Sequence, residues 1–270
     1  MNQISDLQIA ILGAGKMGSA FLQGMLAAPD FCAKQFCAIC RSESSASAVR
    51  ERCGVEALEG WPQDRAFDII LLGVKPAQIR QAVMPLRQLA QAPLVISLVT
   101  GWSIEDLRTA LGSPAEVVRA MPNTPASIGR GMIPYCYSPD FPKDKKWVVE
   151  KILEAGGSTA EIEESQMDAV TGVSGSGPAY FFLFIEALAE AGVREGLPRP
   201  LAQQLALETA AGSAALLQQT GKHAALARED VTSPGGTTIA ALSQLERHGV
   251  RTALFDAVHA AATRSKELGS

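Results

Sequence analysis

The stretch VTSPGGTTIAAL, at positions 231–242, gathers small and hydroxyl-bearing residues where an apolar helix pattern begins. Two glycines, Gly235 and Gly236, allow the backbone to lie close to a ligand. The first backbone N–H groups of a helix carry a partial positive charge, so hydroxyls of Ser233 and Thr237 beside them would complete an anion site without lysine or arginine. The alternative is an ordinary helix cap, because serine and threonine are common at helix starts.

A second glycine-rich motif lies near the N-terminus, in LQIAILGAGKMGSA. Gly13, Gly15 and Gly18 form a GxGxxG directly after a predicted strand and at the head of a predicted helix. In a dinucleotide-binding turn, the first glycine permits the tight turn, the second lets the backbone approach a pyrophosphate, and the third lets helix and strand pack closely. The helix start, with Lys16 and Met17 in its first turn, would supply N–H groups to the phosphates. The motif predicts a dinucleotide site, and a strand–helix turn with incidental glycines is the alternative.

The end of the next predicted strand indicates which dinucleotide is preferred. In sites for NAD, an aspartate or glutamate at this position accepts hydrogen bonds from the ribose 2′-OH. Here the strand ends in AICRSESS, where Cys40 is followed by Arg41 and Ser42. A guanidinium and a hydroxyl suit a 2′-phosphate, although Glu43, one step further, would repel it. We therefore expect NADPH to be preferred and NADH to be accepted. The alternative is that Arg41 is an ordinary solvated loop residue without a role in cofactor binding.

Two later loops follow predicted strands and therefore belong at the carboxyl edge of the sheet, where ligands bind. LLGVKPAQI places Val74, Lys75 and Pro76 there, and VVRAMPNTPASIG places Pro122 and Asn123 there. Prolines on both sides of an Asn-Thr pair make a stiff loop, which suits the presentation of fixed backbone groups to a nicotinamide amide. A structural turn explains the same residues equally well, because proline and asparagine are common in turns.

Histidine is scarce in the chain, with three residues. All three histidines fall in helical or helix-end contexts of the C-terminal region, and none is flanked by an acid. Among the five cysteines, Cys37 and Cys40 form a CxxC, but QFCAIC is typical of a strand, in which these two side chains point to opposite faces. We therefore expect reduced, packed cysteines and no metal site. Reduction of an imine needs less acid–base help than alcohol oxidation, because an imine nitrogen is basic enough to be protonated near neutral pH.

The secondary structure that must position these residues is predicted to change from alternating strands and helices to helices alone along the chain. Up to about residue 162, short β-rich runs alternate with stretches long enough for helices, which predicts βαβ units and a mostly parallel, doubly wound sheet. The remainder is rich in alanine and leucine with helical spacing. We therefore expect a Rossmann-type domain at residues 1–162 and an all-helical domain at residues 163–270. The predicted strands are LQIAILG, QFCAIC, FDIILLGV, PLVISLV, AEVVRAM, GMIPYCY and STAEIE.

The helix predicted in PAYFFLFIEALAEAGVREG is apolar on almost every side. Such a helix has to be buried on every side, and a domain of roughly a hundred residues has too few other elements to cover it completely. We therefore expect oligomerisation through the C-terminal helices. The predicted helix ends in this region are Gly192, Gly196, Gly221 and Gly249.

Composition and charge narrow the class of protein. The chain is 47% hydrophobic and 19% charged, with a formal net charge of −4, which argues against disorder and gives no basic face for nucleic acid. The longest apolar run, AYFFLFIEALA, contains Glu186 and is too short to span a bilayer. The N-terminal segment lacks the basic region and cleavage site of a signal peptide. We expect a cytoplasmic protein that acts on a small molecule, without nucleic-acid or membrane partners.

The sequence resembles the pyrroline-5-carboxylate reductase family over nearly its whole length. VTGVSGSGPAYFFLFIEALAEAGVREGLPR and REDVTSPGGTTIAALSQLE resemble the two signature regions of that family, and GAGKMGSA, VKP and MPNTP match it in the same order. The resemblance implies a Rossmann domain and a helical domain that interleaves with its partner in a homodimer, with a decamer of dimers as the larger assembly. It also implies reduction of the cyclic imine 1-pyrroline-5-carboxylate to L-proline with NAD(P)H, the last step of proline biosynthesis.

The resemblance also implies roles for residues of the two signature regions. The hydroxyl of Thr238 is expected to contact the ring nitrogen of the substrate, as a hydrogen-bond partner or as the proton donor. Ser233, Gly236 and Thr237 are expected to help hold the substrate carboxylate. The SGSGP segment, which contains Ser176, is a second helix-start loop that is expected to close the pocket.

One segment departs from the family pattern. The family carries an asparagine near the adenosine, whereas LEGWPQDRAFD offers Trp61 and Gln63, so its adenosine contacts do not transfer to this chain.

Two other functions stay open. A reductase of another cyclic imino acid, such as the six-membered homologue, would use the same carboxylate clamp. A non-catalytic NADP-binding protein that kept the fold is the other alternative, against which the intact SPGGTT segment argues.

Overall fold

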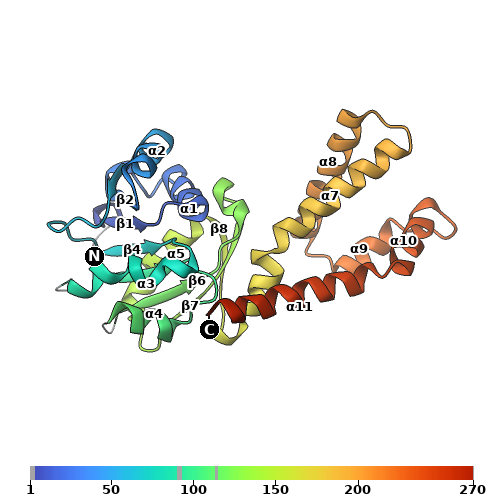
Figure 1. Cartoon of the computed structure of the whole chain (residues 1–270). Helices are drawn as coiled ribbons and strands as arrows, with labels where there is room; N and C mark the ends of the chain where they lie inside the picture. The colour runs from blue at the N-terminus through green and yellow to red at the C-terminus, as the bar shows by residue number, and fades with distance from the viewer. Residues whose placement is uncertain (1–3, 90–92, 113–114, 270) are drawn as a thin grey trace. The chain divides into compact units, whose positions relative to one another are not determined.

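The structure is a computed structural model, and it describes residues 4–89, 93–112 and 115–269 (Figure 1). By its internal contacts the chain divides into two compact units, Met1–Ser176 with His259–Ser270, and Gly177–Val258. The first unit therefore includes residues 163–176 and the end of the last helix, in addition to the expected Rossmann segment. The division into functional domains at residue 162 stays a prediction.

The first unit is built around an eight-stranded sheet with the order β3-β2-β1-β4-β5-β6-β7-β8. Neighbouring strands are parallel, except that β6 and β7 pair antiparallel. The short apolar runs on the central strands are buried on both faces, as parallel strands covered by helices require. The predicted Rossmann-type sheet is confirmed. The strands are β1 (Ile9–Leu12), β2 (Phe36–Cys40), β3 (Glu56–Glu59), β4 (Ile69–Leu72), β5 (Leu94–Ser97), β6 (Val117–Ala120), β7 (Gly131–Tyr137) and β8 (Gly157–Glu161).

Helices cover both faces of this sheet (Figure 1). One apolar layer joins the sheet to α1, α2 and α5, and the other joins it to α3 and α4. The helices of the first unit are α1 (Lys16–Ala27), α2 (Glu43–Cys53), α3 (Ile79–Ala82), α4 (Ile104–Leu111), α5 (Lys146–Glu154) and α6 (Met167–Val170).

The sequence patterns do not predict β3, which is the edge strand beside β2. Its residues are EALE, and only Ala57 is buried. An edge strand with glutamates at both ends carries no apolar run, so the pattern that reveals the other strands is missing here.

The cysteines of β2 behave as packed apolar residues. Cys37 and Cys40 belong to the two opposite apolar layers of the sheet, as the strand spacing predicts. Burial raises the pKa of the Cys37 thiol to about 11, and burial raises that of Cys136 to about 12. All five cysteines lie in the described ranges and are unpaired. In those same ranges, no cluster of three or more His, Cys, Asp or Glu side chains is arranged to hold a metal ion.

The second unit is helical, and the long helices α7 and α8 pack on each other. Gly192 lies inside α7 and not at the predicted helix end. A Cβ there would lie 3.3 Å from the Cβ of Ala202 on α8, so glycine allows these two helices to approach closely. Gly196, Gly221 and Gly249 do follow helix ends, each with positive φ. The helices are α7 (Gly177–Arg194), α8 (Arg199–Thr220), α9 (Ala224–Asp230), α10 (Thr237–Arg247) and α11 (Val250–Gly269), whose last part belongs to the first unit.

The apolar side chains of α7 are largely uncovered in a single chain. Phe181, Phe182 and Leu183 are 67%, 62% and 63% exposed, whereas within α7 only Gly177 and Ala189 are buried. An apolar face of this kind is typical of a protein–protein contact. Among the described residues, no helix combines the length and the apolar character needed to cross a lipid bilayer.

Candidate functional site

The glycine-rich turn connects β1 to α1 and depends on the absence of side chains. Gly13 has φ of +92°, and a Cβ there would lie 2.6 Å from Cγ1 of Val74. A Cβ on Gly18 would lie 2.4 Å from the carbonyl oxygen of Gly13. Gly15 differs, because nothing lies within 4 Å of the place its Cβ would occupy. The first and third glycines therefore fit the fold, and the second leaves the helix start open to a ligand.

The start of α1 has no side-chain cap. Gly15 is its N-cap residue, and no side chain bonds the first-turn N–H groups. These groups have no partner within the helix, because the first turn of any α-helix leaves its donors free. The serine of the first turn is used elsewhere, since Ser19 Oγ donates to the carbonyl of Ala14 at 2.7 Å. Open donors and the helix dipole make this turn suitable for a phosphate.

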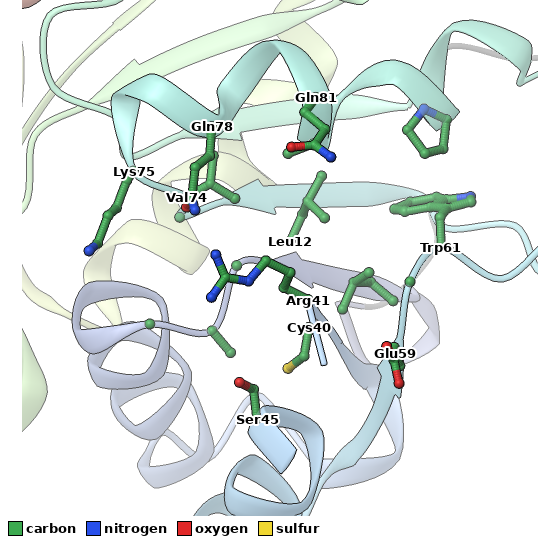
Figure 2. Close-up of a pocket in the computed structure, with 18 residues that line it drawn as sticks. Leu12, Cys40, Arg41, Ser45, Glu59, Trp61, Val74, Lys75, Gln78 and Gln81 are labelled. Carbon is green, nitrogen blue, oxygen red and sulfur yellow. The ribbon is translucent and has the colours of Figure 1, made fainter. Parts of the chain in front are cut away.

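A cavity of about 630 Å³ opens beside this turn, at the carboxyl ends of β1, β2, β3 and β4 (Figure 2). Its volume is within the range of small-molecule and cofactor sites. The cavity joins five of the predicted cofactor residues, Gly13, Gly15, Arg41, Val74 and Lys75. The other predicted cofactor residues, which do not line it, are Lys16, Met17, Gly18, Ser42, Pro76, Pro122 and Asn123.

Arg41 and Ser42 take different positions at the end of β2. The Arg41 side chain is exposed and extends into the cavity toward Val74 and Gln78 (Figure 2). Ser42 is the N-cap of α2, where its Oγ accepts the N–H of Ser45 at 3.4 Å. The hydroxyl expected beside a 2′-phosphate is thus engaged in capping, while Arg41 is directed at the cavity.

Glu43, the acid expected to oppose a 2′-phosphate, has a partner of its own. Its carboxylate pairs with Arg50, two turns further along α2, and its side chain does not line the cavity. The repulsion anticipated from the sequence is therefore reduced, because a paired carboxylate presents less net charge.

Several cavity residues were not anticipated, and most follow β3 or lie on the segment around α3. Glu59 and Trp61 line one side of the cavity (Figure 2), and Trp61 packs edge-on against Phe67 with ring centroids 5.3 Å apart. The sequence places their segment near the adenosine through the family resemblance alone and gives neither residue a role, because the strand before them carries no apolar run. The unanticipated polar or aromatic residues of the lining are Ser45, Glu59, Trp61, Gln78 and Gln81.

The loop after β6 is held by the side chain of Asn123. Its Oδ1 accepts the backbone N–H of Met132 at 3.0 Å, and its Nδ2 donates to Ser174 Oγ at 3.4 Å. Pro122 is buried, and a short 3₁₀ turn, Thr124–Ile128, follows. Because both ends of the Asn123 amide are engaged within the protein, this side chain fixes the loop, and the backbone groups of the loop can be presented to a ligand.

Ser174 belongs to a π-helical turn, Thr171–Gly175, that contains the first two residues of SGSGP. Such turns are rare in proteins, and those that occur are often found at functional sites. Ser176 follows it, half-buried, and its N–H donates to the carbonyl of Thr171 at 2.9 Å. A Cβ on Gly175 would lie 2.7 Å from Cε of Met121, so the glycine allows the turn to pack against the loop after β6.

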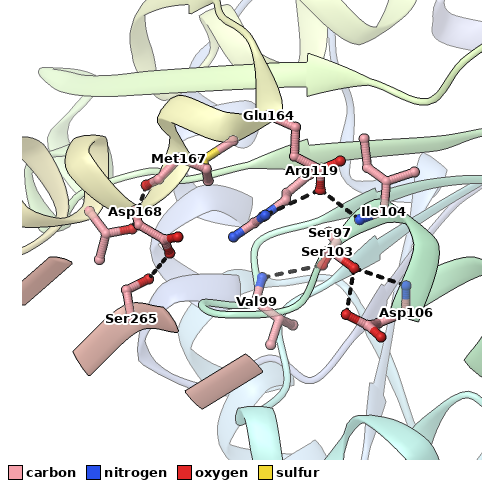
Figure 3. A network of polar contacts seen from close by, with 11 residues as sticks. Ser97, Val99, Ser103, Ile104, Asp106, Arg119, Glu164, Met167, Asp168 and Ser265 are labelled. Carbon is pink, nitrogen blue, oxygen red and sulfur yellow. Dashed lines mark hydrogen bonds and ion pairs between the residues drawn. The ribbon is translucent and has the colours of Figure 1, made fainter. Parts of the chain in front are cut away.

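The segment that leads into this turn is anchored to the sheet unit (Figure 3). The carboxylate of Glu164 accepts the Ile104 N–H at 2.7 Å and pairs with the buried Arg119 of β6 at 3.2 Å. Ser265 of α11, 2% exposed, donates to Asp168 at 2.7 Å. These contacts make the π-turn part of the first compact unit.

The SPGGTT segment lies in the second unit, at the start of α10. Gly235 has φ of +71°, and Gly236 is the N-cap residue, whose N–H donates to the carbonyl of Ser233 at 3.1 Å. No side chain caps this helix. The alternative of an ordinary serine or threonine cap is therefore not realised, and the N–H groups of Thr237 and Thr238 stay available.

The hydroxyls of this segment have no hydrogen-bond partner within the described residues. Ser233 and Thr237 are exposed and Thr238 is half-buried. A turn with free N–H groups and free hydroxyls at a helix start can bind a small anion. The structure thus brings the four substrate residues Ser233, Gly236, Thr237 and Thr238 together, whereas Ser176 and all cofactor residues belong to the other unit.

The histidines carry no arrangement typical of catalysis. His223 is the N-cap of α9, where its Nδ1 accepts the N–H of Ala225 at 3.2 Å. His248 is the C-cap residue of α10, and His259 lies exposed on α11. None of the three lines the cavity.

Two family models match the chain. One, described as pyrroline-5-carboxylate reductase dimerisation, matches residues 164–268, and the other, described as NADP oxidoreductase coenzyme F420-dependent, matches residues 8–101. Among curated proteins, the chain is 39% identical over 268 residues to the pyrroline-5-carboxylate reductase of Synechocystis sp., covering 98% of this chain and 99% of that protein. It is 37% identical over 265 residues to the Arabidopsis thaliana protein of the same name, covering 97% and 96%.

Solved structures of proteins with these names also match nearly the whole chain. A Plasmodium falciparum pyrroline carboxylate reductase with NADP bound matches with a TM-score of 0.89 at 31% identity, covering 98% of this chain and 99% of that one. A Coxiella burnetii pyrroline-5-carboxylate reductase matches with a TM-score of 0.87 at 34% identity, covering 100% of both chains. Both the sheet unit and the helical unit are therefore shared with these structures.

Proposed function

Because the chain belongs to the pyrroline-5-carboxylate reductase family, we propose that it reduces 1-pyrroline-5-carboxylate to L-proline with NAD(P)H, the last step of proline biosynthesis. The observation that carries the proposal is a pair of uncapped helix starts, at α1 and α10, each preceded by a glycine with positive φ. One opens at a cavity of cofactor size, and the other bears the free hydroxyls of SPGGTT. Two anion sites of this kind match a dinucleotide and a small carboxylic acid.

The residues of the cavity fit NAD(P)H. Gly15 leaves space at the start of α1, so the N–H groups there would hold the pyrophosphate. Arg41 would face the 2′-phosphate, which makes NADPH the preferred cofactor and leaves NADH acceptable. The backbone of the loop at Pro122 and Asn123 would face the nicotinamide amide, with Val74, Lys75 and Pro76 on the adjacent loop. When bound, the cofactor supplies the hydride, from nicotinamide C4 to the imine carbon.

The SPGGTT segment would bind and orient the substrate. Ser233, Gly236 and Thr237 would hold the carboxylate at the start of α10, where backbone donors and the helix dipole stabilise an anion. The imine nitrogen is protonated near neutral pH, so the protein mainly has to hold the ring in position. Thr238 would contact the ring nitrogen. A hydroxyl is a weak acid, so orientation of the ring is the role that its chemistry favours, and Ser176 would close the pocket.

A single assay tests this function. Purified protein is mixed with NADPH and 1-pyrroline-5-carboxylate, cofactor oxidation is followed by absorbance, and proline is identified by mass spectrometry. We expect both signals, and proline formation should be faster with NADPH than with NADH. A protein that binds NADPH but does not oxidise it would contradict the proposal in favour of a non-catalytic binding role. A higher kcat/KM with the six-membered cyclic imino acid would identify that compound as the substrate instead.

The proposed assembly is a homodimer formed through the C-terminal helices, with a decamer of dimers as the larger form and the cytoplasm as the location. The exposed phenylalanines of α7 and the match of residues 164–268 to a dimerisation family model support the dimer. Sedimentation velocity should detect the dimer at micromolar concentration. A monomer under those conditions would contradict it.

A further inference from the structure

Glu59 brings a carboxylate to the cofactor cavity from the strand beside β2. The parallel register pairs Glu59 with Cys40, and Arg41 is the next residue on β2. Both Glu59 and Arg41 are exposed and line the cavity (Figure 2). Among the described residues that line the cavity, Glu59 is the only acid, and Arg41 and Lys75 are the cations. The acid that NAD sites carry at the end of β2 thus stands at the end of the neighbouring strand.

The Glu59 carboxylate already uses one donor that a phosphate at this end of the cavity would use. Its Oε2 accepts the backbone N–H of Glu43 at 3.0 Å, the first residue of α2. That N–H has no partner within its own helix. Arg41, by contrast, has no ion-pair or hydrogen-bond partner among the described residues. The two charges therefore act oppositely on any anion that lies between them.

The other acids nearby are neutralised by partners. Glu43 pairs with Arg50, and Glu56, on the same strand as Glu59, pairs with Arg65. Glu59 forms no ion pair among the described residues. Its charge is consequently the one that acts on a group entering beside Arg41.

We infer that Glu59 is a specificity-determining residue that reduces the preference for NADPH over NADH. Its carboxylate competes with the 2′-phosphate for the Glu43 N–H and repels the phosphate charge. This inference rests on the proposed use of NAD(P)H. A cofactor without the 2′-phosphate does not meet the repulsion, so Glu59 weakens binding of the phosphorylated form selectively. Arg41 and Glu59 together then describe a site that binds both cofactors.

The test isolates the 2′-phosphate with two fragments, adenosine 2′,5′-bisphosphate and AMP. Their dissociation constants are measured by isothermal titration calorimetry for the wild-type protein and for Glu59→Gln, in which the amide oxygen can still accept the Glu43 N–H. We expect Glu59→Gln to bind the bisphosphate about threefold to tenfold more tightly, with AMP unchanged, as for loss of a like charge at a solvated rim. The gain should shrink as salt is raised, because screening already weakens the repulsion in the wild type.

Glu56→Gln is the matched control, because it removes a charge from the same strand without lining the cavity, and neither constant should change. Unchanged bisphosphate binding by Glu59→Gln, or equal tightening of both fragments, would overturn the inference. Weaker binding of both would show that Glu59 serves to anchor α2, and would also overturn it. Circular dichroism checks that the variant is folded, and Glu59→Ala repeats the comparison without an amide. A wild-type protein that bound neither fragment would refute the proposed function, and this inference with it.

Discussion

Asn123 and Ser174 are hydrogen-bonded, Nδ2 to Oγ at 3.4 Å, across 51 positions of sequence. The contact joins the loop after β6 to the π-turn Thr171–Gly175 within the first compact unit. With the Met132 N–H on its Oδ1, the Asn123 amide fixes the loop from two sides. The loop that should carry backbone groups to the nicotinamide is therefore positioned by a side chain and not only by its prolines.

The two partners of Asn123 predict unequal effects of substitution. Asn123→Ala should lower the free energy of unfolding by about 1–3 kcal/mol, because the half-buried Met132 N–H loses its acceptor. Ser174→Ala removes only the longer bond and should cost about 0.5–1 kcal/mol. Urea unfolding measures both, and Asn123→Ala should also raise KM for the cofactor. Equal destabilisation by the two variants would contradict the assignment.

Gly13 and Gly15 should respond differently to alanine. Gly13→Ala places a Cβ 2.6 Å from Val74 at a φ of +92°, so it should lower Tm and reduce the yield of folded protein. Gly15→Ala has open space and should leave Tm within about 2 °C, since surface changes are usually small. The same Cβ would occupy the ligand's approach to α1, so NADPH binding should weaken at least tenfold, as judged by fluorescence titration. Unchanged NADPH affinity in Gly15→Ala would argue against the pyrophosphate position.

The sheet and its ligand edge could be predicted because their signals are local. Strands such as IAIL and IILL are continuous apolar runs, and GxGxxG fixes the first βα turn. The roles of Glu59 and Trp61 in the site could not be predicted, because β3 is a polar edge strand whose position is set by pairing with β2. The engagement of Asn123 depends on Met132 and Ser174, which are distant in sequence.

In the helical unit, the sequence patterns also do not predict how individual glycines are used. Glycine is common at helix ends, which predicts a helix end at Gly192, yet this residue lies within α7 where α8 approaches. The residue types of SPGGTT predict a helix start, but they are equally compatible with a serine cap and with the observed glycine N-cap, whose donors are free. That distinction separates a plain helix start from an anion site.

Arg41→Ala should separate the two cofactors. Arg41 extends into the cavity, whereas Ser42 is used to cap α2, so the guanidinium is the principal partner for a 2′-phosphate. The loss of one charge-assisted bond of about 1.5–3 kcal/mol would raise KM for NADPH by roughly tenfold to a hundredfold. KM for NADH should change less than about twofold, because the interaction is absent there. Steady-state kinetics with both cofactors decide, and equal increases would refute the 2′-phosphate role.

Thr238 gives the sharpest test of the substrate site. It lies half-buried in the first turn of α10, and its hydroxyl has no hydrogen-bond partner among the described residues. Thr238→Ala should lower kcat by about tenfold to a thousandfold, the range for one lost transition-state hydrogen bond, while the uncapped helix and Tm stay nearly unchanged. Thr238→Ser keeps a hydroxyl and should retain most activity, whereas the near-isosteric Thr238→Val should behave like alanine.

The three variants also distinguish the two roles open to this hydroxyl. If Thr238 only orients the ring, the pH profile of the residual activity in Thr238→Ala should match that of the wild type, because the imine is protonated by solvent in both. If it donates the proton, the alkaline limb should move to lower pH in the variant, since only imine that has already taken a proton from solvent can then be reduced. Wild-type kcat in both Thr238→Ala and Thr238→Val would remove Thr238 from the mechanism altogether.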